Sequence, residues 1–312
     1  MIAVGFALLG AFSQALASVL HRMTNATTDG EHRSIVQTVG YLVRQPLWLL
    51  GMAAMGGTFV FTALALYFGT LATVQPILVT ELIFTLALRA LWLHDTIPGR
   101  TWGAAGILCV GLFGFLVVAR PQEGHGSPSV LAWVVALSTR GAAIAVLVVL
   151  SRWGSPARRA ALLGAAAGMM WAIDAAFVKS ATDTLAADGW VGLLFHWPLY
   201  AVVASGVAGT FLLEAAFAAG PLAASQSTLL IVDPLASIAM GVELFGEQLA
   251  SSSVAIAFQV VFLLVMFTGV VLLSRWAPPS MEAHVKRSPR TVPVGGDGST
   301  DPPGAPTREP TD

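Results

Sequence analysis

Long apolar segments separated by short polar connections run through most of this 312-residue chain. A helix needs about 20 apolar residues to cross the hydrocarbon core of a bilayer. Nine segments approach or exceed that length: 2–20, 46–68, 71–93, 101–119, 130–150, 160–179, 192–219, 221–244 and 253–274. The pattern predicts nine transmembrane helices. Residues 21–45 are too polar to span and are expected to hold a short interfacial helix, and Trp190 to Trp197 is expected at headgroup depth.

Composition favours a membrane protein over a soluble one. Hydrophobic residues make up 56% of the chain and charged residues 11%, whereas a soluble domain has about 45–50% and about 25%. We therefore expect an all-α integral membrane protein. After Trp276 the chain is rich in Pro, Gly and Ser and cannot bury an apolar face, so residues 277–312 are expected to form a disordered cytoplasmic tail.

Basic residues are distributed unevenly between the two sides of the predicted bundle. With the N-terminus outside, the outer connections carry only Arg120 and Lys179. The inner connections and the tail carry Arg22, Arg33, Arg44, Arg89, Arg100, Arg152, Arg158, Arg159, Arg275, Lys286, Arg287 and Arg290. Since basic residues stay on the cytoplasmic side, we expect the N-terminus outside and the C-terminus in the cytoplasm. The plasma membrane, or the inner membrane of a cell with two, is the expected location.

Two parts of the chain resemble each other. The sequence Gly57-Thr58-Phe59 recurs as Gly209-Thr210-Phe211. Further matches pair Gly10 with Gly168, Gly69 with Gly220, and Gln75 with Gln226. Residues 1–120 would be one repeat of four spans, residues 121–155 a linker helix, and residues 156–276 a second repeat of four spans. Five spans separate the two starts, and an odd number inverts the second repeat, an arrangement typical of secondary transporters.

The second copy of this sequence also predicts local structure. Residues 209–249 indicate a tight hairpin of two apolar helices that turns near Gly220-Pro221. We expect the two repeats to enclose a central cavity lined by spans one, three, six, seven and eight.

Five ionisable side chains interrupt the apolar segments. Glu81, Asp174, Glu214 and Asp233 are acids, and Arg140 is the one base near the middle of a span. Charged groups inside a membrane are costly and usually mark ion, proton or substrate paths. Four acids facing one arginine cannot all be ionised in a low dielectric, which favours a cationic cargo or proton coupling. The alternative is that each acid is neutral and hydrogen-bonded to a neighbouring helix.

Asp233 is the strongest candidate for a substrate or ion site. Gln226 lies two helical turns before it, and Pro234 leaves the carbonyl of Leu230 without its usual donor. Carboxylate, amide and carbonyl oxygens together would suit a hard cation, so Asp233 is also a candidate metal ligand. The first repeat offers Gln75 and Glu81 for the same purpose, although six residues place these two on different helix faces.

Three further side chains have a predicted role. Gln14 places an amide on the first span, where it can line a substrate site or bond a neighbouring helix. Arg140 is expected to pair with an acid and hold the linker helix to the bundle. Lys179, at the end of the sixth span, is expected to snorkel outward.

Several function classes lack any signal. The chain has no nucleotide-binding loop, no cluster of Cys and His, and no nucleophile motif. We therefore expect no cofactor, no nucleic-acid partner and no enzymatic activity. Cys109 is the single cysteine, which rules out an intrachain disulfide.

The residues Leu244-Phe245-Gly246-Glu247-Gln248-Leu249 resemble the end of a repeat in the drug/metabolite transporter superfamily of EamA type. Such repeats carry a proline in the fourth helix and an acid at its end, which Pro234 and Glu247 match, as do Pro76 and Asp95. Nine spans, and the layout from Val79-Thr80-Glu81 to Cys109-Val110-Gly111, are similar to the NIPA-type magnesium transporters of that superfamily. The chain has nine helices rather than the ten of EamA proteins, and His21-Arg22-Met23 stands where NIPA-type proteins carry Lys-Lys-Gly.

This resemblance implies secondary transport by alternating access between two repeats. The leading hypothesis is therefore a proton- or cation-coupled, or facilitative, transporter of a small metabolite or cation. A divalent-cation (magnesium) permease is one alternative, and a non-transporting membrane scaffold or accessory subunit is another. The bilayer and the substrate are the expected partners, and the sequence is compatible with a homodimer.

Overall fold

The computed structural model describes residues 1–27, 45–92, 94, 96–124 and 128–276. The first part of the chain forms α1 (Ile2–Thr27), α3 (Pro46–Tyr67), α4 (Leu71–Leu78), α5 (Glu81–Trp92) and α6 (Gly99–Ala119). The rest forms α7 (Val130–Leu150), α8 (Pro156–Phe195), α9 (Trp197–Ala219), α10 (Leu222–Phe245) and α11 (Ser253–Trp276). The interfacial helix predicted within residues 21–45 and the tail predicted for residues 277–312 fall largely or wholly outside the described residues, as does Asp95.

Within the described residues, nine helical segments are long and apolar enough to cross a membrane, with α4 and α5 together counted as one. Large apolar side chains point away from the bundle, among them Phe113, Phe211 and Leu264, which are 72%, 73% and 61% exposed. Water would penalise so much exposed apolar surface, whereas acyl chains solvate it. The chain is an all-α, multi-pass membrane protein, as the apolar pattern predicts.

The third span is one spanning segment, as predicted, but two helices rather than one form it. Its first part, α4, is capped by Thr70, whose hydroxyl accepts a hydrogen bond from the amide of Thr73. It ends at Leu78, where the amide of Thr80 bonds the carbonyl of Ile77 at 2.9 Å. The Thr80 hydroxyl donates to the same carbonyl at 2.7 Å. Side-chain competition for backbone acceptors, close behind a proline that lacks a donor, explains why the helix tightens and restarts at Glu81.

The sixth span is longer than the predicted residues 160–179. Its last residues include 192–195, where the seventh span was predicted to begin. Helix α8 continues to Phe195 with one interruption at Gly189, whose φ of 69° is readily available only to glycine. The seventh span therefore begins at Trp197 rather than at residue 192. Trp190, on the last turns of α8, is 74% exposed.

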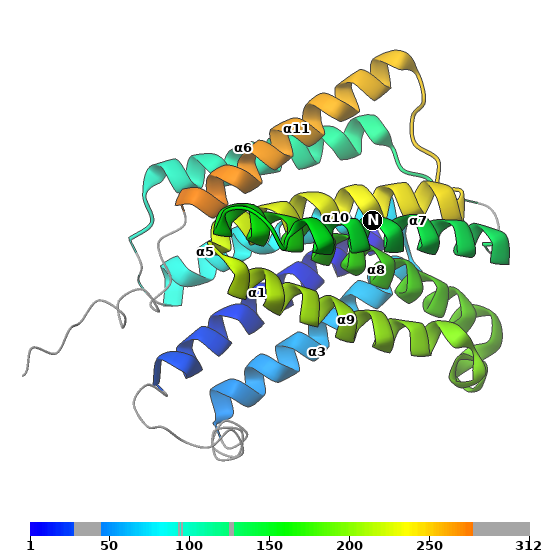
Figure 1. Ribbon diagram of the computed structural model, residues 1–312, viewed down its shortest axis with the longest axis horizontal. Helices are drawn as coiled ribbons and strands as arrows, with labels where there is room; N and C mark the ends of the chain where they lie inside the picture. The colour runs from blue at the N-terminus through cyan, green and yellow to red at the C-terminus, as the bar shows by residue number, and fades with distance from the viewer. Residues whose placement is uncertain (28–44, 93, 95, 125–127, 277–312) are drawn as a thin grey trace, which may run out of the picture. The chain divides into compact units, whose positions relative to one another are not determined.

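Helix α8 lies between α9 and α10 and packs extensively on both, as seen in the centre of Figure 1. The turn predicted at Gly220-Pro221 does separate α9 from α10. However, these two helices hardly touch, so the predicted tight hairpin is wrong in its packing. Glycines on α8 explain the preference: a Cβ added to Gly168 would lie 2.9 Å from the carbonyl oxygen of Leu229 on α10.

Helices α6 and α11 form a close pair along one edge of the bundle (Figure 1). Gly111 of α6 lies against the backbone of Met266, and Gly269 of α11 lies against the backbone of Leu108. At both positions a Cβ would collide with the partner helix, so the absent side chains determine how closely the two helices approach.

The remaining contacts complete the bundle. Helix α1 packs on α3, α4 and α5, and α4 also meets α10. Helix α7 is attached by aromatic contacts. The Trp133 ring stacks on that of Phe177 on α8 and meets that of Trp197 on α9 edge to face, with 5.2 Å between ring centroids in both pairs.

Candidate functional site

Three of the four predicted acids lie near one another. Glu81 stands at the start of α5, Asp174 on α8 and Asp233 on α10. The carboxyl groups of Glu81 and Asp233 are close enough to repel each other when ionised, and Asp233 stands in the same relation to Asp174. We call these three residues the acid row. It joins the two halves of the chain, because Glu81 belongs to the first and the others to the second.

Each acid of the row has a local stabilising feature. Ser237, one turn after Asp233, donates a hydrogen bond to its Oδ1 at 3.2 Å. Ser205 of α9 donates to Oδ1 of Asp174 at 2.7 Å. Glu81 occupies the first turn of α5, where the helix dipole favours a negative charge. The two serines were not singled out from the sequence, although the four-residue spacing of Ser237 from Asp233 is a readable signal.

The other predicted site residues do not join the acid row. Glu214 is exposed on α9, and Gln226 is exposed near the start of α10. Two turns along a helix are a rise of roughly 10 Å, so sharing a helix face does not bring Gln226 to Asp233. Gln14 is half-buried on α1.

Gln75 has a different environment. It lies on α4 and is 5% exposed, and no hydrogen bond joins its amide to any other residue that the structure describes. A buried amide without a partner costs about 1–3 kcal/mol, which suits a group that meets water or a ligand.

The metal hypothesis for Asp233 stays a prediction. Over the described ranges, no group of three or more His, Cys, Asp or Glu side chains is arranged to hold a metal ion.

Arg140 forms an ion pair with Glu243 of α10 at 2.7 Å. The linker helix α7 is thereby bonded to the second half of the bundle. Glu243 is not one of the four acids that interrupt the spans. It lies near the end of its helix, where a charged residue is ordinary, so the sequence did not mark it as a partner.

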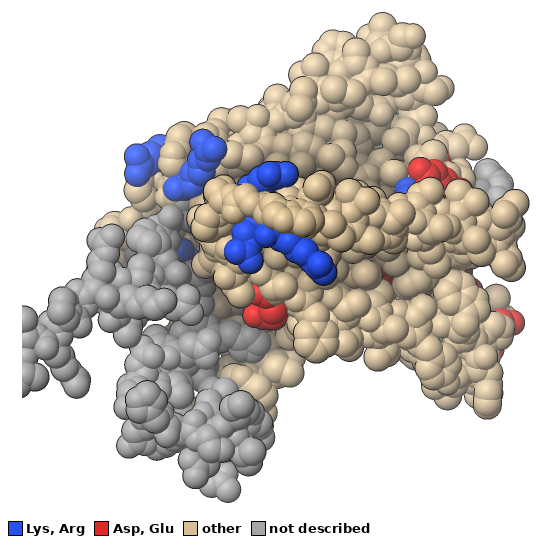
Figure 2. Space-filling view, viewed as in Figure 1, with Lys and Arg blue, Asp and Glu red and all other residues tan. Residues whose placement is uncertain are grey.

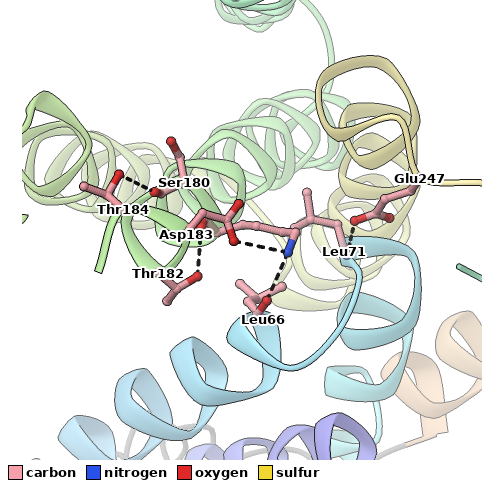
Figure 3. A network of polar contacts seen from close by, with 8 residues as sticks. Leu66, Leu71, Ser180, Thr182, Asp183, Thr184 and Glu247 are labelled. Carbon is pink, nitrogen blue, oxygen red and sulfur yellow. Dashed lines mark hydrogen bonds and ion pairs between the residues drawn. The ribbon is translucent and has the colours of Figure 1, made fainter. Parts of the chain in front are cut away.

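A second group of buried charges lies at one end of the bundle. The ammonium of Lys179 donates to the carbonyl of Leu66 at 3.2 Å and lies 3.7 Å from Asp183 (Figure 3). Lys179 is only 9% exposed, so the predicted outward snorkelling is wrong. The last carbonyls of α3 lack helical donors, and the lysine supplies one from α8.

Glu247 supplies hydrogen-bond acceptors to the start of α4. Its two carboxylate oxygens accept hydrogen bonds from the amides of Leu71 at 2.6 Å and Ala72 at 2.9 Å. Burial raises the pKa of Glu247, and the two amide donors and nearby Lys179 oppose that rise. Glu247 thus caps a helix that is far away in the sequence. We call Lys179 and Glu247 the end clamp.

The connections around the end clamp are also joined across the two halves. Gln122, after α6, and Gln248, after α10, exchange two backbone hydrogen bonds of 2.9 and 3.1 Å. The amide of Ala250 donates to the carbonyl of Ala119 at 2.8 Å. Both halves are therefore fastened to each other at this end.

Comparison with known proteins adds a relative without a described function. The uncharacterized protein Cgl0250/cg0304 of Corynebacterium glutamicum is 29% identical over 289 residues, covering 92% of this chain and 99% of that protein. No family model and no solved structure matches the chain.

Proposed function

We propose that this protein is a secondary transporter that moves a small metabolite or cation by alternating access between residues 1–120 and residues 156–276. The observation that carries the proposal is the acid row, since Glu81 comes from one half and Asp174 and Asp233 from the other. Acids within membrane-spanning helices, at the boundary between two halves of a transporter, are typical of proton or cation coupling.

Helix contacts support an internal repeat. The numbers of Gly10 and Gly168 differ by 158, as do those of Gly111 and Gly269 and of Leu108 and Met266. A twofold relation would turn the Gly111–Met266 contact into the Gly269–Leu108 contact, and both are present. A Cβ added at Gly10 would lie 3.4 Å from the side chain of Leu78, and one added at Gly168 would lie 2.9 Å from the carbonyl oxygen of Leu229. Leu78 and Leu229 are 151 positions apart, as are Gln75 and Gln226.

The end clamp supports alternating access. It ties the ends of α3 and α4 to α8 and to the residues after α10, so that the two halves are closed against each other at this end. Under the orientation predicted from basic residues, this is the outer end. In this proposal, the clamp opens when the transporter exposes the acid row to the outside.

The decisive test is transport by purified protein in liposomes. We expect one class among amines, amino acids and divalent cations to be taken up or to dissipate an imposed pH gradient. Asp233→Asn keeps an acceptor for Ser237 but removes the titratable charge, and should reduce the initial rate by roughly tenfold or more. The exposed acid Glu214, changed to Gln, serves as the matched control and should transport normally.

Two results would contradict the proposal. Unchanged transport in Asp233→Asn would remove the acid row from the mechanism. No uptake of any solute, together with a partner that copurifies in fixed ratio, would favour the scaffold or accessory subunit instead. Uptake restricted to magnesium would favour the permease.

A further inference from the structure

A cavity of about 520 Å³ opens on the side of the bundle between α3, α8 and α9. Its lining includes Phe59, Trp171, Asp174, Gly206 and Phe211. Both copies of the Gly-Thr-Phe motif meet here, since Phe59 comes from the first and Phe211 from the second. The rim is apolar and exposed, so the cavity faces the acyl chains. This cavity is not the predicted central one. That cavity was expected to be lined by spans one, three, six, seven and eight, whereas α3 is the second span.

Asp174 is the charged group of this cavity. It is 9% exposed, and only its Oδ1 accepts a hydrogen bond from a described residue, Ser205. The hydroxyl of Thr210 bonds the carbonyl of Gly206 on its own helix and so does not compete for the carboxylate. One carboxylate oxygen therefore remains available to a ligand.

Ser205 suits both charge states of Asp174. Its hydroxyl lies 2.7 Å from Oδ1 of Asp174, 2.8 Å from the carbonyl of Ala201 and 3.2 Å from that of Val202. One proton can serve only one of these acceptors. Ser205 can donate to an ionised Asp174, or donate to its own helix and accept from a protonated Asp174. Asp174 and Ser205 can therefore stay hydrogen-bonded to each other before and after a cation binds.

Aromatic rings provide the remaining recognition. Trp171 lies on Gly209, where an added Cβ would come within 3.2 Å of the indole, so glycine makes room for the ring. Indole and phenyl faces attract organic cations, and apolar walls accommodate a hydrocarbon body. A single carboxylate with few other polar groups fits neither a phosphate nor a sugar.

We propose that this cavity binds a small organic ammonium ion with an apolar body, its charge held by Asp174 and its body by Trp171, Phe59 and Phe211. That the ion is the transported substrate rests on the proposed function, whereas its binding does not. The cavity size and its opening toward the membrane select amphiphilic amines over fully hydrated ones.

Binding can be measured by calorimetry on the full chain in a maltoside detergent, which contains no ammonium. The probe is phenylethylammonium, and 2-phenylethanol is its neutral analogue of similar size. We expect the amine to bind and the alcohol to bind much more weakly. Asp174→Asn, which keeps an oxygen for Ser205, should weaken amine binding by roughly tenfold or more. Glu214→Gln should leave it unchanged.

A second variant tests the cavity without altering the acid. A Cβ at Gly206 would lie 3.7 Å from Oδ1 of Asp174, and no other atom is within 4 Å, so Gly206→Ala is tolerated. Gly206→Leu extends further into the cavity and should abolish binding while the protein stays folded.

Three outcomes would overturn the proposal: equal binding of alcohol and amine, unchanged binding in Asp174→Asn, or occupation by phosphatidylethanolamine with no response to the free amine. Amine binding that requires Asp174 without amine transport in liposomes would retain this site and reject the transport role. Transport of another solute without amine binding would reject this site alone.

Discussion

Two buried charged residues of this protein, Lys179 and Glu247, bind the ends of helices. Lys179 reaches the last turn of α3, and Glu247 receives the first amides of α4. Helix ends carry unpaired donors and acceptors and partial charges of the matching sign. A residue with the appropriate charge on a neighbouring element can therefore join two helices that are distant in the sequence.

Glu247→Ala tests this arrangement. It leaves the amides of Leu71 and Ala72 without acceptors, and we expect the free energy of unfolding to fall by about 1–3 kcal/mol. Thermal denaturation of the solubilised protein measures the change. Glu123→Ala removes an exposed acid near the same place and should cause no loss. Equal midpoints for wild type and Glu247→Ala would contradict the role of Glu247.

The same variant has a pH dependence of defined sign. Because burial raises the pKa of Glu247, the folded protein holds this proton more tightly than the unfolded chain. The stability it contributes is complete below its unfolded pKa and declines as pH rises through its folded pKa. The difference in midpoint between wild type and Glu247→Ala should therefore be larger at pH 5 than at pH 8, and an opposite trend would be inconsistent with burial as the cause.

At the scale of helices, glycine determines which elements approach closely. Gly111 and Gly269 bring α6 against α11, whereas Gly103 and Gly106 on α6 have no neighbour within 4 Å of an added Cβ. Sequence alone did not distinguish these positions, because all four glycines stand in equally apolar helices.

Gly111→Ala and Gly269→Ala should each destabilise the protein, by about 1–3 kcal/mol, since the new methyl group overlaps the partner backbone. Gly103→Ala is the matched control and should be neutral or slightly stabilising, as alanine favours helix. Denaturation midpoints report all three. A Gly111→Ala protein as stable as Gly103→Ala would show that the two helices can separate without cost.

At the scale of the whole molecule, most of the Lys and Arg visible on the face shown in Figure 2 lie in its left half. Chain order places Arg100, Arg152, Arg158, Arg159 and Arg275 at one end of the helices. The end clamp and Arg120 are at the other. The orientation remains a prediction from the positive-inside rule.

Cysteine labelling tests that orientation. After Cys109→Ala, a cysteine at Glu123 should react with a membrane-impermeant maleimide added to intact cells, because the connection after α6 is predicted to lie outside. A cysteine at Gly99, exposed at the start of α6, should react only after the cells are opened. The reverse pattern would invert the topology and place the end clamp at the cytoplasmic end.

The sequence alone determined the helical class, the number of spanning segments and the positions of the acids inside them. These follow from local properties, since apolar length and the cost of a buried charge are read residue by residue. The break before Glu81, the position of α8 between α9 and α10, and the partners of Arg140, Lys179 and Glu247 depended on the tertiary structure. Those features arise where side chains from distant segments compete for the same backbone groups or fill the same space, and no local pattern records which segment will be the neighbour.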